Sequence, residues 1–533
     1  MAEAVRETES QVFAANLLAQ LVACGVEHVY LAPGSRSQAL AIAANQLAVA
    51  GKLKLHIRLD ERSLAFQALG AARASNKPVA VITTSGTAVA NLYPAVLEAF
   101  HTSTPLLLLT ADRPHALRNT GSNQTTLQND IFGHFVLKCF DIDASAPNTD
   151  FSEIAKFAKE LAVDAVAVSL GHAREHAGPV QLNLGFREPL SSTQPNAAEV
   201  KYLLAPTKIE SHSVVAEIDL SLNTLVIAGD QANKPSEFDV SGLPVFAEPT
   251  SGLTTSQFSI PTYREALARY GDQAYDFENL EQVVVLGKPT LSREIQKLIR
   301  VPGLKVYSIP GSHRDFKPTP ETIQANRLDR KGEPNPEWFE RFKYFPLELQ
   351  DSLRISGEKL STIEIARSVR NQADENDRLI LGASTVIRDF ERAGLRFNGE
   401  VFANRGLAGI DGTIAFASGI ADTDPAQKVI AVVGDLTALH DVGSLAYGDS
   451  DDALNFRLIV VNNRGGAIFD RLEVRELLDD ESFEKLFSTP QHVNFEALAA
   501  AYSWQYQKVT NQFELNAALE MPGRVLVEAY VEK

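Results

Sequence analysis

Two short hydrophobic runs near the carboxyl end of the chain constrain its fold most strongly. Val429–Val433 is followed by Gly434-Asp435, and Leu458–Val461 is followed by Asn462-Asn463-Arg464-Gly465-Gly466. Runs of this kind, separated by a helix-length segment, predict a strand, a crossover helix and a parallel strand. Ligands of such sheets bind beyond the carboxyl ends of the strands. We therefore expect Asp435 and Asn463 to point oxygen atoms at one site.

These two strand ends carry the donor types of a metal–phosphate site. A carboxylate, an amide oxygen and the carbonyls of a glycine-rich turn suit a hard cation such as Mg²⁺ that keeps part of its coordination for a phosphate. The amides near Thr437 and Ala438 are expected to meet the same phosphates. The stretch has no G-x-x-x-x-G-K-[ST] pattern, which disfavours a P-loop nucleotide site. Either pair alone would favour ordinary strand-end turns, so the interpretation depends on their occurring together.

Length and charge narrow the class of protein. A chain of 533 residues is too long for one core and suggests about three domains. A net charge of -17 argues against nucleic acid and anionic membranes as partners. Cys24 and Cys139 form no ligand cluster, and the acidic MAEAVRETES start lacks the order of a signal peptide. No hydrophobic run approaches the roughly 20 residues that span a bilayer. These features predict a soluble, cytoplasmic protein.

The pattern of strand, glycine turn, helix, strand and polar turn also occurs near the amino end. PVAVITTSGTA, a helical segment and PLLLLTADRP repeat the carboxyl-terminal order without matching its residues. A strand ending at Leu31 is followed by Pro33-Gly34-Ser35-Arg36-Ser37, which suits an anion. Another strand ends in Asp60-Glu61, where an acid is most often a helix cap. The polar loop 115–133 is long enough to be an active-site loop.

A middle region completes the predicted organisation. It has strands at 224–228, 245–247, 283–287 and 304–309 with helices between them, and it lacks the G-x-G-x-x-G pattern of a dinucleotide site. Pro310–Pro336 is rich in proline and charge and is interpreted as a connection. We predict three doubly wound α/β domains with mainly parallel sheets, at residues 1–190, 205–345 and 355–533.

The motifs together resemble a known family. The chain is similar to the 2-succinyl-5-enolpyruvyl-6-hydroxy-3-cyclohexene-1-carboxylate (SEPHCHC) synthases, thiamine-diphosphate enzymes of menaquinone biosynthesis, over almost its whole length and least in the middle region. The motifs that carry the resemblance are PGSRS (33–37), DERS (60–63), TSGTAVANLYPAV (84–96), TADRP (110–114), GSNQ (121–124), NRGLAGIDG (404–412), GDLTALHD (434–441) and NNRGGAIF (462–469). Leu436 departs from the second glycine of many thiamine-diphosphate enzymes, but GDL is usual in this family. The resemblance implies pyrimidine-binding, central and diphosphate-binding domains.

The resemblance also implies a cofactor site. Glu61 matches the catalytic glutamate that hydrogen-bonds N1′ of the aminopyrimidine and promotes proton transfer from thiazolium C2. Ile410 matches the residue that bends the cofactor. Asp435, Asn463 and the Gly465 carbonyl match the ligands of Mg²⁺, for which Mn²⁺ can substitute. The full implied set of cofactor-binding residues is Glu61, Gly409, Ile410, Gly434, Asp435, Leu436, Thr437, Asn463, Gly465, Ile468 and Phe469.

The reaction of the family implies the substrates. It is a transferase reaction that decarboxylates 2-oxoglutarate and adds the resulting succinyl carbanion equivalent to isochorismate in a 1,4-addition. Because both substrates carry two carboxylates, a local cluster of arginines is needed in an acidic protein. Ser384 and Arg388 match residues that hold the distal carboxylate of the succinyl unit. The residues implied on the isochorismate side are Ser35, Arg36, Arg113, Asn123, Gln124, Arg293 and Arg405; for any single arginine, an ordinary surface position remains the simpler reading.

Two other functions stay open on the sequence. An acetohydroxyacid synthase-like 2-oxoacid decarboxylase or carboligase would handle pyruvate and would not need Ser384 with Arg388. A non-catalytic binding protein on the same scaffold is disfavoured by the intact set Glu61, Ile410, Asp435 and Asn463. The resemblance further implies a homodimer with shared active sites, or a tetramer built from such dimers.

Overall fold

The computed structural model describes residues 8–144, 150–172, 176–190, 196–202, 214–232, 238–261, 263–264, 267, 279–311, 313, 316–343, 360–394, 396–448 and 454–531. The chain forms two compact units. The first comprises residues 1–211, 414–424 and 441–452, and the second comprises residues 212–413, 425–440 and 453–533. The predicted domain boundaries at 205, 345 and 355 lie outside the described residues, and that division stays a prediction.

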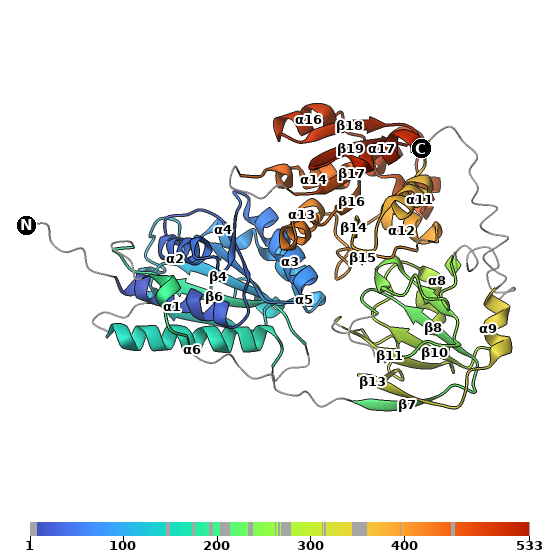
Figure 1. Ribbon diagram of the computed structural model, residues 1–533, viewed down its shortest axis with the longest axis horizontal. Helices are drawn as coiled ribbons and strands as arrows, with labels where there is room; N and C mark the ends of the chain where they lie inside the picture. The colour runs from blue at the N-terminus through green and yellow to red at the C-terminus, as the bar shows by residue number, and fades with distance from the viewer. Residues whose placement is uncertain are drawn as a thin grey trace, which may run out of the picture. The chain divides into compact units, whose positions relative to one another are not determined.

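The first unit is built on a six-stranded parallel sheet in the order β2-β1-β3-β4-β6-β5. Its strands are β1 (His28–Leu31), β2 (Lys54–Ile57), β3 (Val79–Thr83), β4 (Leu106–Asp112), β5 (Cys139–Asp143) and β6 (Val180–Gly185). Its helices are α1 (Glu9–Ala23), α2 (Gln38–Val49), α3 (Glu61–Ser75), α4 (Thr87–Ala90), α5 (Tyr93–His101) and α6 (Phe151–Ser169) (Figure 1).

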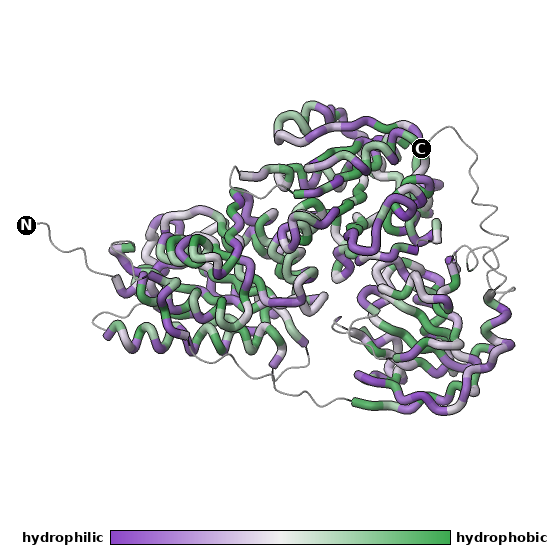
Figure 2. Tube along the Cα trace, viewed as in Figure 1, coloured by the Kyte–Doolittle hydropathy of each residue, from purple (hydrophilic) through white to green (hydrophobic). Residues whose placement is uncertain are grey.

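Alternation along the strands explains why helices cover both faces of this sheet. Val29 and Leu31 join the core cluster formed by residues of α1, α2 and α6, whereas Tyr30, between them, points to the other face. Helices α3 and α5 pack on each other outside that cluster. Figure 2 shows hydrophobic residues gathered along the strands and alternating with hydrophilic ones along α6, as expected for a helix with one buried side.

The second unit holds the central sheet, which is also parallel. Its order is β12-β11-β10-β8-β9, and a two-stranded ladder β13-β7 accompanies it. The strands are β7 (Val215–Asp219), β8 (Thr224–Ala228), β9 (Val245–Ala247), β10 (Gln282–Leu286), β11 (Lys305–Ile309), β12 (Ile323–Gln324) and β13 (Arg327–Lys331), with helices α8 (Arg293–Leu298) and α9 (Pro336–Lys343). The prediction that Pro310–Pro336 is a connection is wrong. Ile323 and Leu328 pack into the central core, and their strands pair with β11 and β7 despite the charged sequence around them.

The third sheet, also in the second unit, has the order β15-β14-β16-β17-β19-β18. Its strands are β14 (Arg378–Leu381), β15 (Glu400–Phe402), β16 (Val429–Gly434), β17 (Phe456–Asn462), β18 (Gln505–Val509) and β19 (Arg524–Tyr530). The helices of this part of the chain are α11 (Thr362–Gln372), α12 (Thr385–Arg392), α13 (Thr413–Thr423), α14 (Asp435–His440), α15 (Asp480–Phe483), α16 (Phe495–Ala501) and α17 (Gln512–Glu520). Nearly all of α13 belongs to the first unit.

The first and third sheets have the same topology. Numbered from its own first strand, each runs 2-1-3-4-6-5, so the strand order reverses between β1 and β3 and again between β14 and β16. The sequence prediction of two copies of one architecture is therefore confirmed. Ligands of open parallel sheets bind at such reversal points, beyond the carboxyl ends of the strands. Each sheet thus has one preferred position for a ligand.

Candidate active site

The carboxyl ends of β16 and β17 lie side by side, as the sequence predicts. The two strands pair in parallel, and Gly434 at the end of β16 is opposite Val461. Asp435 begins α14 directly after β16, and Asn463 follows β17. The connecting helix is shorter than expected, because α14 ends at His440 and a 3₁₀ turn follows.

The Asp435 carboxylate organises the glycine-rich turn beside it. It is 6% exposed, and its Oδ1 accepts the Leu436 N–H at 2.7 Å while its Oδ2 accepts the Gly465 N–H at 2.8 Å. Gly465 has φ +124°, and a Cβ there would lie 2.1 Å from the Ser488 carbonyl oxygen. Only glycine can therefore hold this turn against Asp435.

A cavity of about 190 Å³ opens at this edge of the third sheet. It lies at the reversal point between β14 and β16, since residues that follow each of these strands line it. The predicted residues in its lining are Ser384, Ile410, Gly434, Asp435, Leu436, Thr437, Asn463, Gly465, Ile468 and Phe469. The prediction did not include the remaining lining residues, Thr362, Ala383, Thr385, Val386, Val461, Gly466 and Ala467. Gly466 and Ala467 lie inside the NNRGGAIF motif and could have been found there; Thr362, at the start of α11, carries no such signal.

Gly409 is the predicted cofactor residue of this unit that the cavity lining does not include. It precedes Ile410, and a Cβ on Gly409 would lie 2.2 Å from Asp411 Oδ1. A side chain at position 409 would therefore require the Asp411 carboxylate to move.

The donor set at the cavity fits a small hard cation with a phosphate ligand. Within the described residues, no group of three or more His, Cys, Asp or Glu side chains is placed to hold a metal ion. A metal ion at the cavity would therefore depend on the Asp435 carboxylate, the Asn463 amide oxygen and a turn carbonyl. Mg²⁺ binds in this way when substrate phosphates complete its coordination.

Arg388 belongs to a partly buried cluster of charges in the same unit. Its Nη1 donates to the Ser384 carbonyl at 2.6 Å, and Ser384 has φ +73°, a strained conformation for serine. Burial lowers the pKa of Arg388, and the neighbouring guanidinium groups of Arg405 and Arg264 lower it further. Such a cluster is the arrangement expected for binding a dicarboxylate.

Two buried glutamates, Glu391 and Glu248, lie beside these arginines. Glu391 accepts from Arg264 Nη1 at 2.6 Å and from the Tyr263 hydroxyl. Burial raises the pKa of Glu248 to about 8, and the nearby Glu391 carboxylate contributes to this rise. Arg293, by contrast, is exposed and pairs with Glu473 at 3.3 Å on the surface.

In the first unit, Glu61 is the first residue of α3, directly after the β2 turn. Asp60 caps the helix by accepting the N–H groups of Arg62 at 2.9 Å and Ser63 at 3.3 Å. The Glu61 side chain is half-buried and makes no hydrogen bond or ion pair to a described residue. The capping role that the sequence allows for Glu61 therefore belongs to Asp60.

Helix α3 is fixed by its close approach to α13 in the same unit. A Cβ on Gly70 would lie 2.0 Å from the Phe416 carbonyl oxygen, and one on Gly419 would lie 1.9 Å from that of Gln67. The Ser444 hydroxyl lies 2.9 Å from Ser63 Oγ. These contacts hold the helix that carries Glu61 in one position.

Predicted anion-binding residues meet at the reversal point of the first sheet. Arg113 Nη1 donates to the Gln124 carbonyl at 2.9 Å and to Ser85 Oγ, and Gln124 Nε2 donates to the Ser85 carbonyl at 3.0 Å. Burial lowers the pKa of Arg113, and the nearby Arg36 guanidinium lowers it further. Arg36 itself donates to the Phe186 carbonyl at 3.0 Å. The other predicted residues here, Ser35 and Asn123, are exposed.

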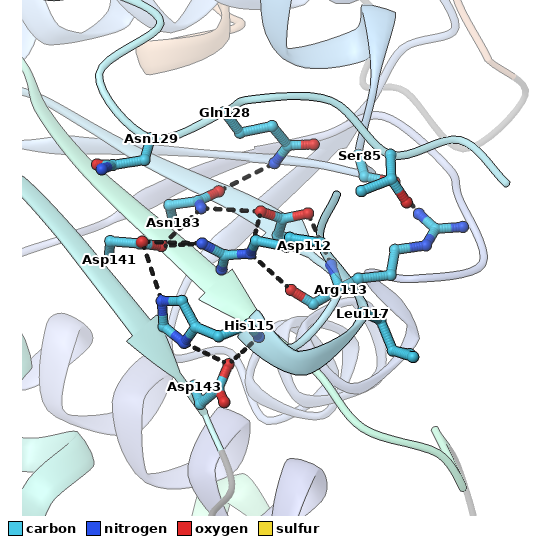
Figure 3. A network of polar contacts seen from close by, with 12 residues as sticks. Ser85, Asp112, Arg113, His115, Leu117, Gln128, Asn129, Asp141, Asp143 and Asn183 are labelled. Carbon is cyan, nitrogen blue, oxygen red and sulfur yellow. Dashed lines mark hydrogen bonds and ion pairs between the residues drawn. The ribbon is translucent and has the colours of Figure 1, made fainter. Parts of the chain in front are cut away.

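The polar network next to Arg113 was not predicted from the sequence (Figure 3). Asn183 Nδ2 donates to Asp112 at 3.0 Å and to Asp141 at 2.8 Å, and Arg118 pairs with both carboxylates. Gln128 Nε2 donates to Asn183 Oδ1 at 2.9 Å, and its Oε1 accepts the Gly86 N–H at 2.8 Å. The network fixes the ends of β4, β5 and β6. Its members come from separate strands and loops, so no local pattern identifies them.

Comparison with known proteins agrees with this geometry. Residues 12–133 match the N-terminal TPP binding domain of thiamine pyrophosphate enzymes, and residues 389–527 match the C-terminal TPP binding domain. The SEPHCHC synthase of Leifsonia xyli subsp. xyli is 36% identical, with 98% of this chain and 96% of the relative covered. That of Paenarthrobacter aurescens is 37% identical, with 96% and 92% covered.

The chain belongs to the SEPHCHC synthase family. The SEPHCHC synthase of Mycobacteroides abscessus is a further relative, 35% identical with 95% of this chain and 93% of the relative covered. The predicted family and the predicted α/β fold with parallel sheets are confirmed. The two domain matches assign thiamine-diphosphate-binding domains to both ends of the chain. In the part of the chain that the structure describes, no helix combines the length and hydrophobicity that membrane crossing requires.

Proposed function

We propose that this chain is a SEPHCHC synthase: a transferase that decarboxylates 2-oxoglutarate and joins the remaining four-carbon unit to isochorismate, with release of CO₂. The observation that carries the proposal is the cavity of the third sheet. It gathers the predicted diphosphate-side residues together with Ser384, and Arg388 donates to the Ser384 carbonyl.

The residues at the cavity have distinct proposed tasks. Asp435, Asn463 and the Gly465 carbonyl would hold Mg²⁺ or Mn²⁺, and Ile410, Ile468 and Phe469 would pack against the cofactor. Bound thiamine diphosphate would supply a nucleophilic carbon and an electron sink for the charge left by departing CO₂. Glu61 would hold and exchange the proton at N1′ of its aminopyrimidine.

The arginines are proposed to hold the substrate carboxylates. Arg388 with Ser384 would take the distal carboxylate of 2-oxoglutarate, a group that pyruvate lacks. The isochorismate side would be formed by Ser35, Arg36, Arg113, Asn123, Gln124, Arg293 and Arg405. Arg113 and Arg405 are buried and Arg388 is half-buried, so their contacts with a carboxylate would be shielded from bulk water, where a charge-assisted hydrogen bond is weaker.

We also propose a homodimer in which each cofactor site takes Glu61 from one subunit and Asp435 from its partner. The motivation is the family resemblance and the separation of the two residues into different units of the chain. The pyrimidine-binding, central and diphosphate-binding domains would be residues 1–190, 205–345 and 355–533. We expect the enzyme to work in the cytoplasm.

One assay tests the proposed reaction. The purified protein is incubated with thiamine diphosphate, Mg²⁺, 2-oxoglutarate and isochorismate, and the product is identified by mass. We expect CO₂ release and the mass of the adduct only when all four are present. A parallel reaction with pyruvate in place of 2-oxoglutarate addresses the alternative carboligase. Preference for pyruvate, or no cofactor-dependent CO₂ release, would refute the proposal.

A further inference from the structure

The segment that follows β15 is held by the edge of the central sheet. Arg405 is 3% exposed; its Nε donates to Thr290 Oγ1 at 2.9 Å and its Nη2 to the Thr290 carbonyl at 3.2 Å. The next carbonyl, that of Gly406, accepts from Lys288 Nζ at 3.3 Å. Arg405 Nη1 is buried and has no hydrogen-bond partner among the described residues. Two of the three guanidinium nitrogens are therefore committed to one threonine.

Thr290 is in turn held by Glu248. The Glu248 Oε1 accepts the N–H groups of Thr290 at 2.6 Å and Leu291 at 2.9 Å, and its Oε2 accepts the Thr290 hydroxyl at 3.1 Å. A hydroxyl has one hydrogen to donate. Because Glu248 takes that hydrogen, the lone pairs of Thr290 Oγ1 are turned toward Arg405. The carboxylate thus fixes both the backbone and the hydroxyl that hold the guanidinium.

Burying these polar and charged groups is unfavourable for folding, which argues that they have a role beyond packing. Glu248 is 2% exposed and lies near the second buried carboxylate, Glu391. Hydrophobic residues of similar volume usually stabilise such an interior as well or better. The unused, desolvated Nη1 of Arg405 adds to the cost unless a ligand accepts from it. An anionic substrate group would satisfy it.

We propose that Glu248, acting through Thr290, is a positioning residue that presents Arg405 Nη1 to a carboxylate of isochorismate. The inference rests on the proposed function and extends it, because it gives the central sheet a part in substrate binding. Glu248 follows β9 and Thr290 follows β10, so the carboxyl edge of the central sheet sets the orientation of an arginine on the segment after β15. Neither residue touches the reacting atoms.

Substitutions at Thr290 test the chain of contacts. Thr290→Val removes the hydroxyl at nearly constant volume, and Thr290→Ser restores it. We expect Thr290→Val to raise KM for isochorismate about five- to tenfold and to leave kcat within about twofold, because ground-state and transition-state binding weaken together. Thr290→Ser should return KM to within about twofold of the parent. Glu248→Ala, which removes both oxygens that contact Thr290, should shift KM in the same direction and serves if Thr290→Val does not fold.

Two controls separate the positioning of Arg405 from a general disturbance of the central sheet. Asp230→Asn removes another buried carboxylate of the central sheet, one that pairs with His313, and should leave KM for isochorismate unchanged. In an Arg405→Ala background, Thr290→Val should have no further effect on KM, since the group that it positions is gone. Unchanged KM in Thr290→Val, no recovery in Thr290→Ser, or additive effects with Arg405→Ala would each overturn the proposal.

Amide hydrogen exchange tests the positioning role of Thr290 without depending on the proposed reaction. Amide exchange in residues 404–409 should be faster in Thr290→Val than in the parent and should return to the parent rate in Thr290→Ser. If the parent enzyme made no adduct, the proposed function would fail while this measurement still decided whether Thr290 holds the segment. Unchanged exchange in Thr290→Val would refute positioning even in a fully active enzyme.

Discussion

Glu61 stands at the start of α3 with a carboxylate that no described residue engages, while its neighbour Asp60 performs the capping. We predict that Glu61→Gln leaves the protein folded but removes nearly all turnover. A neutral amide cannot exchange a proton with N1′ as a carboxyl group does, and such roles are typically worth about 100- to 10,000-fold. The measurement is kcat at saturating cofactor and substrates, with circular dichroism as the check on folding.

Glu153 provides the matched control for this variant. It is also an acidic residue in the first turn of a helix of the first unit, and it is exposed. Glu153→Gln should retain the activity of the parent. Turnover of Glu61→Gln within about threefold of the parent would assign Glu61 a structural role instead.

Arg388 is half-buried near the guanidinium groups of Arg405 and Arg264, and burial lowers its pKa. We predict that Arg388→Ala weakens 2-oxoglutarate far more than it weakens thiamine diphosphate. Loss of one charge-assisted carboxylate contact should cost on the order of 1.5 to 3 kcal/mol, or roughly ten- to a hundredfold in KM. Arg392, one turn further along α12 and 3.9 Å from Asp389, is the control, and Arg392→Ala should change neither constant. A fall in cofactor affinity with an unchanged KM for 2-oxoglutarate would place Arg388 in the cofactor site.

Site residues can be predicted from the sequence where they directly follow a hydrophobic run that ends at a polar turn. Asp435 and Asn463 follow uninterrupted hydrophobic runs, so their placement could be predicted from order alone. Glu248 and Thr290 also follow strands, but no motif surrounds them. Their importance comes from hydrogen bonds to Arg405, more than one hundred positions away, which only the folded chain brings together.

At the scale of elements, strand runs are the most predictable feature. The predicted strand 224–228 has the bounds of β8, because five buried hydrophobic or β-branched residues end at a glycine. Helices are less well predicted. The single helical segment predicted between PVAVITTSGTA and PLLLLTADRP is divided into α4 and α5, with Pro94 near the start of the second. Proline is tolerated there and not inside a continuous helix, so the division has a local cause.

The start of α13 contains a titratable cap. Asp441 Oδ2 accepts the N–H groups of Ile414 at 2.7 Å and Ala415 at 3.0 Å, and the Ser444 hydroxyl lies 2.7 Å from Oδ1. Burial raises the pKa of Asp441 from 3.8 to about 6 despite these hydrogen bonds. The folded state therefore binds this proton more tightly than the unfolded state does. Its stabilising contribution is full below the unfolded pKa and is lost as the pH rises through about 6.

We predict that Asp441→Asn removes this pH dependence. The amide keeps an oxygen for the Ile414 and Ala415 N–H groups and carries no charge at any pH. A pKa rise from 3.8 to about 6 corresponds to about 3 kcal/mol in the free energy of unfolding. The Tm of the parent should therefore fall relative to that of the variant between pH 4 and pH 7. Thermal unfolding of both proteins across this range is the measurement. A constant difference in Tm would show that the pKa of Asp441 is the same in the folded and unfolded states, and would contradict the prediction.

At the scale of the whole molecule, the division into units raises the question of how one cofactor can bind residues from both ends of the chain. The match to an N-terminal and a C-terminal TPP binding domain assigns cofactor binding to both ends of the chain, and Glu61 and Asp435 fall in different units. The proposed two-fold dimer would solve this by symmetry, because an interface that joins the first unit of one subunit to the second unit of its partner generates two equivalent sites.

Mixing two inactive variants, Glu61→Gln and Asp435→Ala, tests the proposed dimer. In a mixed dimer with shared sites, one site receives both lesions and the other receives an intact Glu61 from one chain and an intact Asp435 from the other. Random pairing of equal amounts makes about half of the dimers mixed, each with one good site of two, so co-refolding or co-expression should recover about a quarter of the parent activity. Each variant alone, treated identically, should stay inactive. If every site formed within a single chain, each site would keep one lesion and mixing would restore nothing, which would refute the shared-site dimer.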